Sequence, residues 1–137
     1  MTSLIVPVIR LEAYFSRAGE TIAGAGGQTL ARWLVLETVA DAPATVAQIA
    51  RGLGYKRQSV QRVADLLEQD GLTRYVLNPA HQRSQLVRIT PLGRKTLSTI
   101  QGAQRVWADS VGSEIGETEL RQAGLVVDNL TRILKTQ

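Results

Sequence analysis

Seven consecutive residues, KRQSVQR at positions 56–62, concentrate amide, hydroxyl and guanidinium groups in about two helical turns. Glutamine can hydrogen-bond adenine N6 and N7 together, arginine can hydrogen-bond guanine O6 and N7, and serine can bond either kind of base edge. At 100° per residue, a helix here has a polar face opposite an apolar one. The polar face holds Gln58, Gln61, Arg62, Asp65 and Gln69, and the apolar face holds Val60, Val63, Ala64 and Leu67. This pattern favours a helix that meets base edges with its polar face.

Cationic residues flank this face in positions that suit phosphate groups. Lys56 and Arg57 stand at the predicted helix N-terminus, where free backbone N–H groups also attract anions. The polar loop NPAHQRSQ carries Arg83, which suits the negative potential of a narrow minor groove. Arg88 follows on the next apolar run and can either reach a phosphate or brace a hairpin. His81, in the same loop, is open to two interpretations, a proton-linked switch or an ordinary solvated side chain.

The segment from Thr45 to Lys95 is far more basic than the rest of the chain. It carries nine Lys and Arg residues against three acidic residues, a net charge of +6. The remaining residues carry seven basic and nine acidic side chains, a net charge of −2. A basic block in a mildly acidic chain is typical of a surface that meets a phosphate backbone. Double-stranded DNA is therefore the expected partner.

Two other classes of function fit parts of the sequence. The glycine stretch GAGG at 24–27 is similar to part of a phosphate-binding loop, but no strand is predicted before it, and the third glycine and the P-loop lysine are missing. One histidine and no cysteine leave little from which to build a catalytic or thiolate metal site. We therefore expect no catalytic residues, no metal and no cofactor. The other alternative is a winged-helix module that binds protein without binding DNA.

Local signals predict the elements that position the basic face. Apolar spacing and turn residues predict helices over 11–22, 30–40, 45–53 and 56–69. Pro43 lies beyond the second helix, and Thr45 and Gln48 have the spacing of a capping box for the third. Gly71 stands where a left-handed cap usually ends a helix. The third and fourth helices therefore form a helix-turn-helix.

A hairpin and two more helices are predicted downstream. Two β-leaning runs, 72–77 and 86–89, flank the polar loop. Thr90 and Pro91 are an N-cap and a first-turn proline for a helix that runs to about residue 111. Its expected apolar stripe is Leu97, Ile100, Ala103, Val106 and Trp107. The last helix starts near residue 117, and its apolar residues step by three and four as in a coiled-coil seam: Leu120, Ala123, Val127, Leu130 and Leu134.

Three stretches between Leu30 and about Leu97 carry a family resemblance: LARWLVLETVAD, TVAQIARGLGYKRQSVQRVADLLEQDGL and HQRSQLVRITPLG. They resemble the MarR family of bacterial transcriptional regulators. The resemblance implies a homodimer built from helices of both chain ends, a palindromic operator, and release by a small, often aromatic or anionic ligand. Carried over by position, it implies major-groove reading by Gln58, Ser59, Gln61 and Arg62, and a wing role for Arg83.

Two positions depart from the family pattern. The family usually has Ser or Thr as the helix cap where Lys56 stands, and the missing cap costs roughly 1 kcal/mol of helix stability, which a bound phosphate can offset. The wing of the family usually reads Asp-x-Arg, whereas this chain has His81, Gln82 and Arg83. The wing arginine therefore lacks the aspartate expected to brace it.

The sequence as a whole predicts a homodimeric, sequence-specific DNA-binding transcriptional regulator, a repressor, located in the cytoplasm without membrane contact. The expected fold is mainly α with a small β-hairpin wing. We expect a single domain over 1–137, a winged helix-turn-helix over 30–95, and dimerisation helices over 4–23 and 96–137. The predicted DNA contacts are Thr45, Lys56, Arg57, Gln58, Ser59, Gln61, Arg62, Arg83 and Arg88. Aromatic residues that either line an effector pocket or belong to the core are Tyr14, Phe15, Trp33 and Trp107.

Overall fold

The computed structural model describes all residues from 1 to 137 and contains six helices and three short strands. The helices are α1 (Thr2–Gly24), α2 (Leu30–Thr38), α3 (Val46–Leu53), α4 (Arg57–Gln69), α5 (Pro91–Gly112) and α6 (Glu117–Leu134). The strands are β1 (Ala44–Thr45), β2 (Thr73–Leu77) and β3 (Gln85–Ile89). The predicted fold class, a mainly α winged helix-turn-helix, is confirmed.

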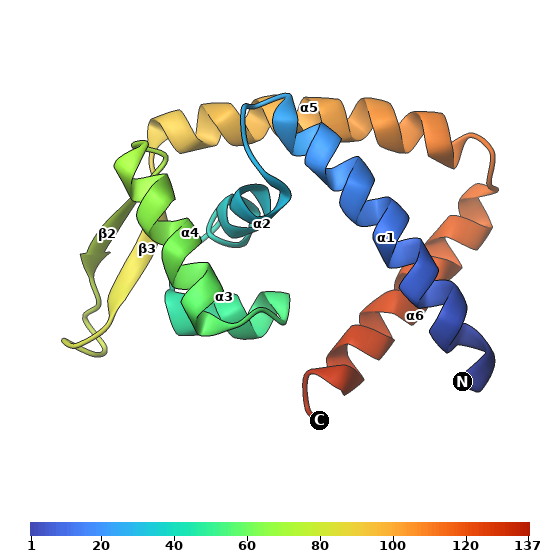
Figure 1. Ribbon diagram of the computed structural model, residues 1–137, viewed down its shortest axis with the longest axis horizontal. Coiled ribbons are helices and arrows are strands. Elements are labelled where there is room, and N and C mark those ends of the chain that lie inside the picture. Colours follow the sequence, from blue (N-terminus) through green and yellow to red (C-terminus); the bar gives the residue numbers. More distant parts are fainter.

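The long helix α5 joins two parts of the molecule (Figure 1). At one end, α2, α3, α4 and the β2–β3 hairpin pack together; we call residues 30–95 the winged-helix region. Toward the other end, α1 runs down from α5 and crosses α6 in the view (Figure 1); we call residues 4–23 and 96–137 the terminal helices. None of the helices combines the length and the apolar character needed to cross a membrane.

The hydrophobic core lies mainly in the winged-helix region, which contributes 13 of its 17 residues. Its 17 buried apolar residues all lie between Ile22 and Ile100. The largest side chains with almost no exposed surface are Leu36, Ile49, Leu67, Ile100, Val35, Val39, Val60 and Val87. Three of the four residues predicted for the apolar face of α4, namely Val60, Ala64 and Leu67, are buried, and Val63 packs against them. The polar face of α4 is thereby left to solvent.

Local capping signals position the helix-turn-helix as the sequence predicts. Thr45 Oγ1 accepts a hydrogen bond from the Gln48 N–H at 3.1 Å, and Gln48 Oε1 accepts one from the Thr45 N–H at 2.9 Å, so the capping box is confirmed. Lys56 is the N-cap residue of α4 and its side chain makes no cap hydrogen bond, as predicted. Gly71, just beyond α4, has a left-handed φ of +75°.

The sheet has three strands in the order β1-β3-β2, where the sequence predicted only a two-stranded hairpin. β2 and β3 pair antiparallel with Tyr75 opposite Val87, and β1 pairs with the other edge of β3. The missed strand β1 has only two residues, so no alternating pattern reveals it. The first turn of α5 packs on this sheet at Gly93, where a Cβ atom would lie 2.0 Å from the Leu72 carbonyl oxygen. Only glycine permits that approach.

Other differences from the sequence prediction concern helix bounds and the exposure of apolar residues. Helix α1 begins at Thr2 and not near residue 11, because Pro7 removes a single hydrogen bond near the helix start without ending the helix. Helix α2 ends at Thr38 and not at residue 40. Val106, predicted for the apolar stripe of α5, is 73% exposed, and α6 buries none of its residues. These apolar positions point away from the core, so a single chain gives them no partner.

Candidate nucleic-acid interface

Helix α4 presents its polar residues to solvent, beginning at an uncapped end. The exposed residues that the sequence selected for base reading are Gln58, Ser59, Gln61 and Arg62. At the start of the helix, Lys56 and Arg57 are also exposed, and no side chain caps the first backbone N–H groups. Such a helix end offers free donors together with the positive end of the helix dipole. Its chemistry suits a phosphate oxygen.

A recess of about 540 Å³ joins α3, α4 and the wing. Thr45 at the start of α3, Arg57 and Gln61 on α4, and Arg83 in the wing loop all line it. In Figure 1 the start of α4 and the tip of the β2–β3 hairpin lie on the same side of the molecule. The fold thus brings together four predicted DNA contacts from three separate segments of the chain.

The other predicted contacts lie outside this recess. Gln58 and Arg62 line a shallower hollow along α4 together with Gln61, whereas Lys56 and Ser59 line a hollow between α4 and α2. Arg88 is exposed on β3, directly opposite Arg74 on β2. Like charges in directly opposite positions repel each other. An anion near this arginine pair would relieve that repulsion.

The wing loop is organised by residues that sequence reasoning missed. Asn78 Nδ2 donates to Ser84 Oγ across the loop at 3.0 Å, and Asn78 Oδ1 accepts from the Ala80 N–H at 3.0 Å. The His81 N–H donates to the Asn78 carbonyl at 3.2 Å. The loop that carries Arg83 is therefore held by Asn78 in the absence of the usual aspartate. The Asn-Pro dipeptide at its start was the available signal, because asparagine side chains often close such turns.

A second group that sequence reasoning missed surrounds Gln61. Gln61 Nε2 donates to Asp65 Oδ1 at 3.0 Å and to the Tyr75 hydroxyl oxygen at 2.9 Å, and the Tyr75 hydroxyl donates to Asp65 Oδ1 at 2.6 Å. Burial, and then the hydrogen bond to Asp65, raise the pKa of the Tyr75 phenol well above its usual range. The phenol therefore keeps its proton at neutral pH. The spacing of Gln61 and Asp65 along α4 hinted at their contact, but Tyr75 arrives from β2.

Known proteins share this fold and part of this sequence. Residues 27–84 match a sequence model described as the MarR family. An uncharacterised protein of Mycobacterium tuberculosis is 43% identical over 97 residues, which span 71% of this chain and 68% of that protein. The chain belongs to the MarR family.

Solved structures agree with this assignment. The MarR family transcription regulator SP03579 is 25% identical with a TM-score of 0.79, over 97% of this chain and 87% of that one. MOSR of Mycobacterium tuberculosis, a transcriptional regulator solved in complex with DNA, is 20% identical with a TM-score of 0.75, over 96% and 95% of the two chains. Members of the MarR family are winged-helix, DNA-binding transcription factors, and this chain is one of them.

In this MarR family chain, a separate cavity of about 330 Å³ lies where α1, α2 and α5 meet. Phe15, Trp33 and Trp107 line it, and the rings of Phe15 and Trp107 meet edge to face with centroids 5.5 Å apart. Trp33 is also a core residue, 8% exposed, as the simpler interpretation of the sequence expected. Three of the four aromatic residues selected from the sequence thus share one cavity.

Two tyrosines differ from the sequence expectation for this cavity. Tyr14 lies outside its wall, 66% exposed, with the Arg17 guanidinium over its ring. One step along a helix turns a side chain by 100°, so Tyr14 and Phe15 face different ways. Tyr55, which the sequence did not select, does line the cavity. Because Tyr55 immediately precedes Lys56, it connects the cavity to the start of α4.

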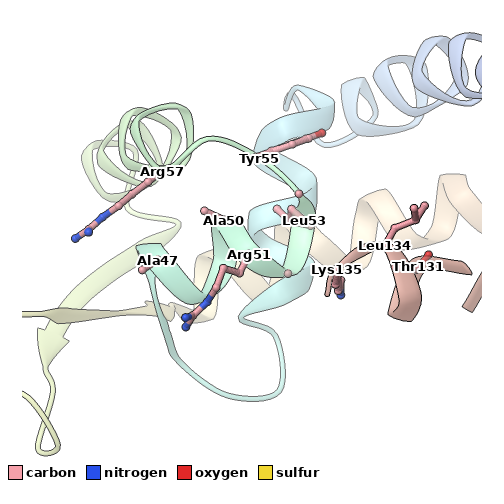
Figure 2. Close-up of a pocket in the computed structure, with 11 residues that line it drawn as sticks. Ala47, Ala50, Arg51, Leu53, Tyr55, Arg57, Thr131, Leu134 and Lys135 are labelled. Atoms are coloured by element: carbon pink, nitrogen blue, oxygen red, sulfur yellow. The ribbon is translucent and has the colours of Figure 1, made fainter. Parts of the chain in front are cut away.

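A larger hollow, about 910 Å³, separates the winged-helix region of this MarR family protein from the end of α6. Figure 2 shows Arg51 and Arg57 at one side of it, with their guanidinium groups directed away from α6. Thr131 and Leu134 lie on the opposite side (Figure 2). Leu134 is 62% exposed, so the end of α6 is not packed against the winged-helix region of its own chain.

Proposed function

We propose that this MarR family protein is a homodimeric repressor that binds a palindromic operator, with half-sites about one helical turn apart. The observation that carries the proposal is the recess in which Thr45, Arg57, Gln61 and Arg83 converge. A helix that enters the major groove and a wing that reaches the next minor groove must touch one continuous stretch of duplex. A recess shared by both elements meets that requirement, and the net charge of +6 over 45–95 suits the phosphates around it.

Each predicted contact takes a role in this proposal. Gln58, Ser59, Gln61 and Arg62 read base edges from α4, and Arg83 enters the minor groove. Thr45, Lys56 and Arg57 bind phosphates beside the starts of α3 and α4. Arg88 acts together with Arg74, whose facing charges a phosphate would neutralise.

The homodimer is supported by apolar side chains that a single chain leaves in solvent. On α1 these include Leu4, Ile5, Val8, Ile9 and Leu11, and on α6 they include Leu120, Val127 and Leu134, each at least 41% exposed. Apolar surface gathered on the same elements is typical of a protein interface. We propose that residues 4–23 and 96–137 of two copies cover one another and set the spacing of the two α4 helices.

The experiment for DNA binding compares Arg62→Ala with Lys56→Ala on operators selected from genomic fragments. Arg62→Ala should cost about 1–3 kcal/mol on the operator and relax base preference, whereas Lys56→Ala should weaken binding to all sequences and lower the salt slope by about 1. Lys95→Ala is the matched control, because Lys95 is an exposed lysine on α5 that lines neither the recess nor the two hollows along α4. Unchanged binding by both Arg62→Ala and Arg83→Ala would contradict the assigned contacts.

A salt series separates this proposal from a winged-helix module that binds only protein. Binding that neutralises several phosphates weakens steeply as salt rises, whereas a contact with an apolar centre does not. Flat salt dependence, with no fragment selected, would favour the protein-binding module. Transcription in vitro from a promoter that carries the selected operator tests the sign of regulation: a repressor lowers the transcript, and an increase would contradict this part of the proposal.

We propose further that the cavity at Phe15, Trp33 and Trp107 binds a small aromatic effector. The only charged residue in its wall is Glu12, which would repel an anion, so an uncharged aromatic ring suits it better. Binding of a ring in the cavity can affect the start of α4 through Tyr55, because a displaced Tyr55 would shift the neighbouring Lys56. The test is tryptophan fluorescence and operator affinity across a panel of neutral aromatic compounds and aromatic acids. Ala108→Leu, which fills part of the cavity, should reduce both responses; a panel without any response would end the effector proposal.

A further inference from the structure

The cavity where α1, α2 and α5 meet has an apolar floor and a mouth that carries a carboxylate. The buried residues of its wall are Gly19 and Ile22 of α1 and Trp33 of α2. Glu12 of α1 and Gln104 of α5, by contrast, line it from exposed positions. A bound ligand would therefore place its apolar part against the floor and its polar part beside Glu12 and Gln104.

The Trp33 side chain contributes a ring to this cavity and no free hydrogen-bond donor. Its indole has a single N–H, which donates to Glu37 Oε2 at 3.1 Å. Gln101 Nε2 on α5 donates to Glu37 Oε1 at 3.2 Å, which holds that carboxylate in place. The indole therefore meets a ligand through its aromatic surface.

The Glu12 carboxylate keeps one oxygen atom for a ligand. Ser16, one turn along α1, donates its hydroxyl hydrogen to Glu12 Oε1, and Glu12 Oε2 makes no hydrogen bond within the chain. The other polar groups of the wall, the Tyr55 hydroxyl and the Gln104 amide, are uncharged. The strongest polar group offered to a ligand is therefore a hydrogen-bond acceptor with a negative charge.

No lysine or arginine lines the cavity to offset this charge. Arg17 of α1 lies over the ring of Tyr14, outside the wall, with its guanidinium carbon 5.5 Å from the ring centroid. Arg32 of α2 is paired with Asp70 at the end of α4. An anionic ligand would thus meet Glu12 without a compensating cation, whereas a cationic ligand would be paired.

The aromatic residues of the wall also favour a cation. Phe15, Trp33, Tyr55 and Trp107 all line the cavity, and the face of an aromatic ring attracts an ammonium group placed over it. Aromatic rings beside one carboxylate are thus a suitable site for an organic ammonium ion. The cavity volume of about 330 Å³ suits a ligand with a single ring.

We propose that the effector is a protonated arylalkylamine, with its ring against the floor of the cavity and its ammonium group paired with Glu12 at the mouth. This inference rests on the proposed effector cavity and names the chemical class of its ligand. The ring itself is uncharged, and the cation is carried on a short side chain. An alkylamine of this kind is protonated at neutral pH, as a lysine side chain is.

The test uses three compounds that share a phenyl ring and differ in charge: 2-phenylethylamine, 2-phenylethanol and 3-phenylpropanoate. Isothermal titration calorimetry on the full chain measures their affinities. The wild type should bind the amine roughly tenfold more tightly than the alcohol, and the acid more weakly than the alcohol. The advantage of the amine should decrease as salt rises, because salt screens the contact with Glu12.

Two variants of Glu12 test the pairing directly. Glu12→Gln keeps the shape and can still accept from Ser16, so it should bind the amine and the alcohol equally well. Glu12→Lys reverses the charge and should make the acid the tightest ligand, a gain of binding that a misfolded protein cannot produce. Glu20→Gln is the matched control, because Glu20 lies about two turns along α1, outside the wall, and accepts the Leu30 N–H at 3.2 Å, which glutamine can also accept. It should keep the wild-type order.

The outcomes separate this inference from the proposed function. Tightest binding of the acid by the wild type, equal binding of all three compounds, or the wild-type order retained by both Glu12 variants would overturn the inference, and the cavity would remain a site for an uncharged ring. Loss of the order in Glu20→Gln would also overturn it, because the preference would then not arise from pairing with Glu12. If the wild type bound none of the three compounds, both the inference and the proposed effector cavity would fail.

Discussion

The winged-helix region and the terminal helices use their apolar residues in opposite ways. The winged-helix region holds 13 of the 17 buried apolar residues, and residues 45–95 carry a net charge of +6. The terminal helices bury only Ile22, Ala23, Leu97 and Ile100 and expose most of their other apolar side chains, and α6 buries none of its residues. One part of the chain therefore completes its own core, while the other requires a second surface. A single copy can therefore form the recess by itself, whereas we propose that the exposed apolar residues of the terminal helices are covered only when two copies meet.

The largest expected effect tests whether the winged-helix region stands on its own core. Ile49→Ala should lower the free energy of unfolding by about 2–5 kcal/mol, because Ile49 has no exposed surface and its loss leaves a cavity. Denaturant unfolding followed by circular dichroism measures this loss, which should be the same at low and high protein concentration. Leu134→Ala on α6 is the matched variant, and its cost should appear as weaker dimerisation. If the loss of unfolding free energy in Ile49→Ala varied with protein concentration, the winged-helix region would not be stabilised by its own core alone.

The next effect tests the terminal helices. Val127→Glu places a charge in the predicted seam of α6, where Val127 is 60% exposed in a single chain. We expect a monomer and roughly a 100-fold or greater loss of operator affinity, because two linked half-site contacts become independent. Sedimentation velocity and fluorescence anisotropy measure these changes. Asn129→Asp adds a charge to the other side of α6 and should change neither the oligomeric state nor the operator affinity. If the Val127→Glu protein remained dimeric, the seam of α6 would not be part of the dimer interface.

A smaller effect concerns the uncapped start of α4 within the winged-helix region. Lys56→Ser supplies the missing cap and should add about 1 kcal/mol to the free energy of unfolding. The same change removes a cation, so affinity for every DNA sequence should fall and the salt slope should decrease by about 1. Thermal unfolding and a salt titration measure the two results. Unchanged stability would show that the α4 N–H groups are already satisfied, and unchanged DNA affinity would show that Lys56 makes no phosphate contact.

The smallest effect concerns the Tyr75 hydroxyl. Burial first, and then Asp65, raise the pKa of Tyr75 above its usual value of about 10. A group whose pKa is higher in the folded state contributes stability that is complete below the unfolded pKa and is lost as the pH rises toward the folded value. The hydrogen bonds of the hydroxyl should make the wild type more stable than Tyr75→Phe at neutral pH, by on the order of 1 kcal/mol, and because of the raised pKa this difference should shrink above about pH 10. Parallel stability curves, measured by urea unfolding between pH 7 and 11, would contradict this account.

Much of the fold was predictable because its signals act over a few residues. The capping box of Thr45 and Gln48, the absent cap at Lys56 and the glycine that ends α4 each involve neighbours within one helical turn. The polar face of α4 followed from helix geometry, and its exposure is confirmed. The start of α1 was predicted wrongly, since residues 4–9 are apolar on every side and contain Pro7, which masks the helical spacing.

The candidate site was predictable only in part. The residue types on α4 and Arg83 came from the sequence, but their gathering in one recess with Thr45 did not. Asn78 as the organiser of the wing loop and Tyr75 as the partner of Gln61 were both missed. Each depends on where strands β2 and β3 bring distant residues together, and no local pattern encodes that.

The sequence by itself determined which segments form helices, which face of α4 is polar and which part of the chain is basic. These properties follow from periodicity, caps and charge, which depend on residues near one another along the chain. Only the tertiary structure decided that β1 joins the sheet, that Tyr75 and Asp65 both accept from the Gln61 amide nitrogen, and that α6 is left without a partner in its own chain. The physical reason is that these contacts join residues that are distant in sequence. Their positions in space are set only when all the helices and strands have packed against the core.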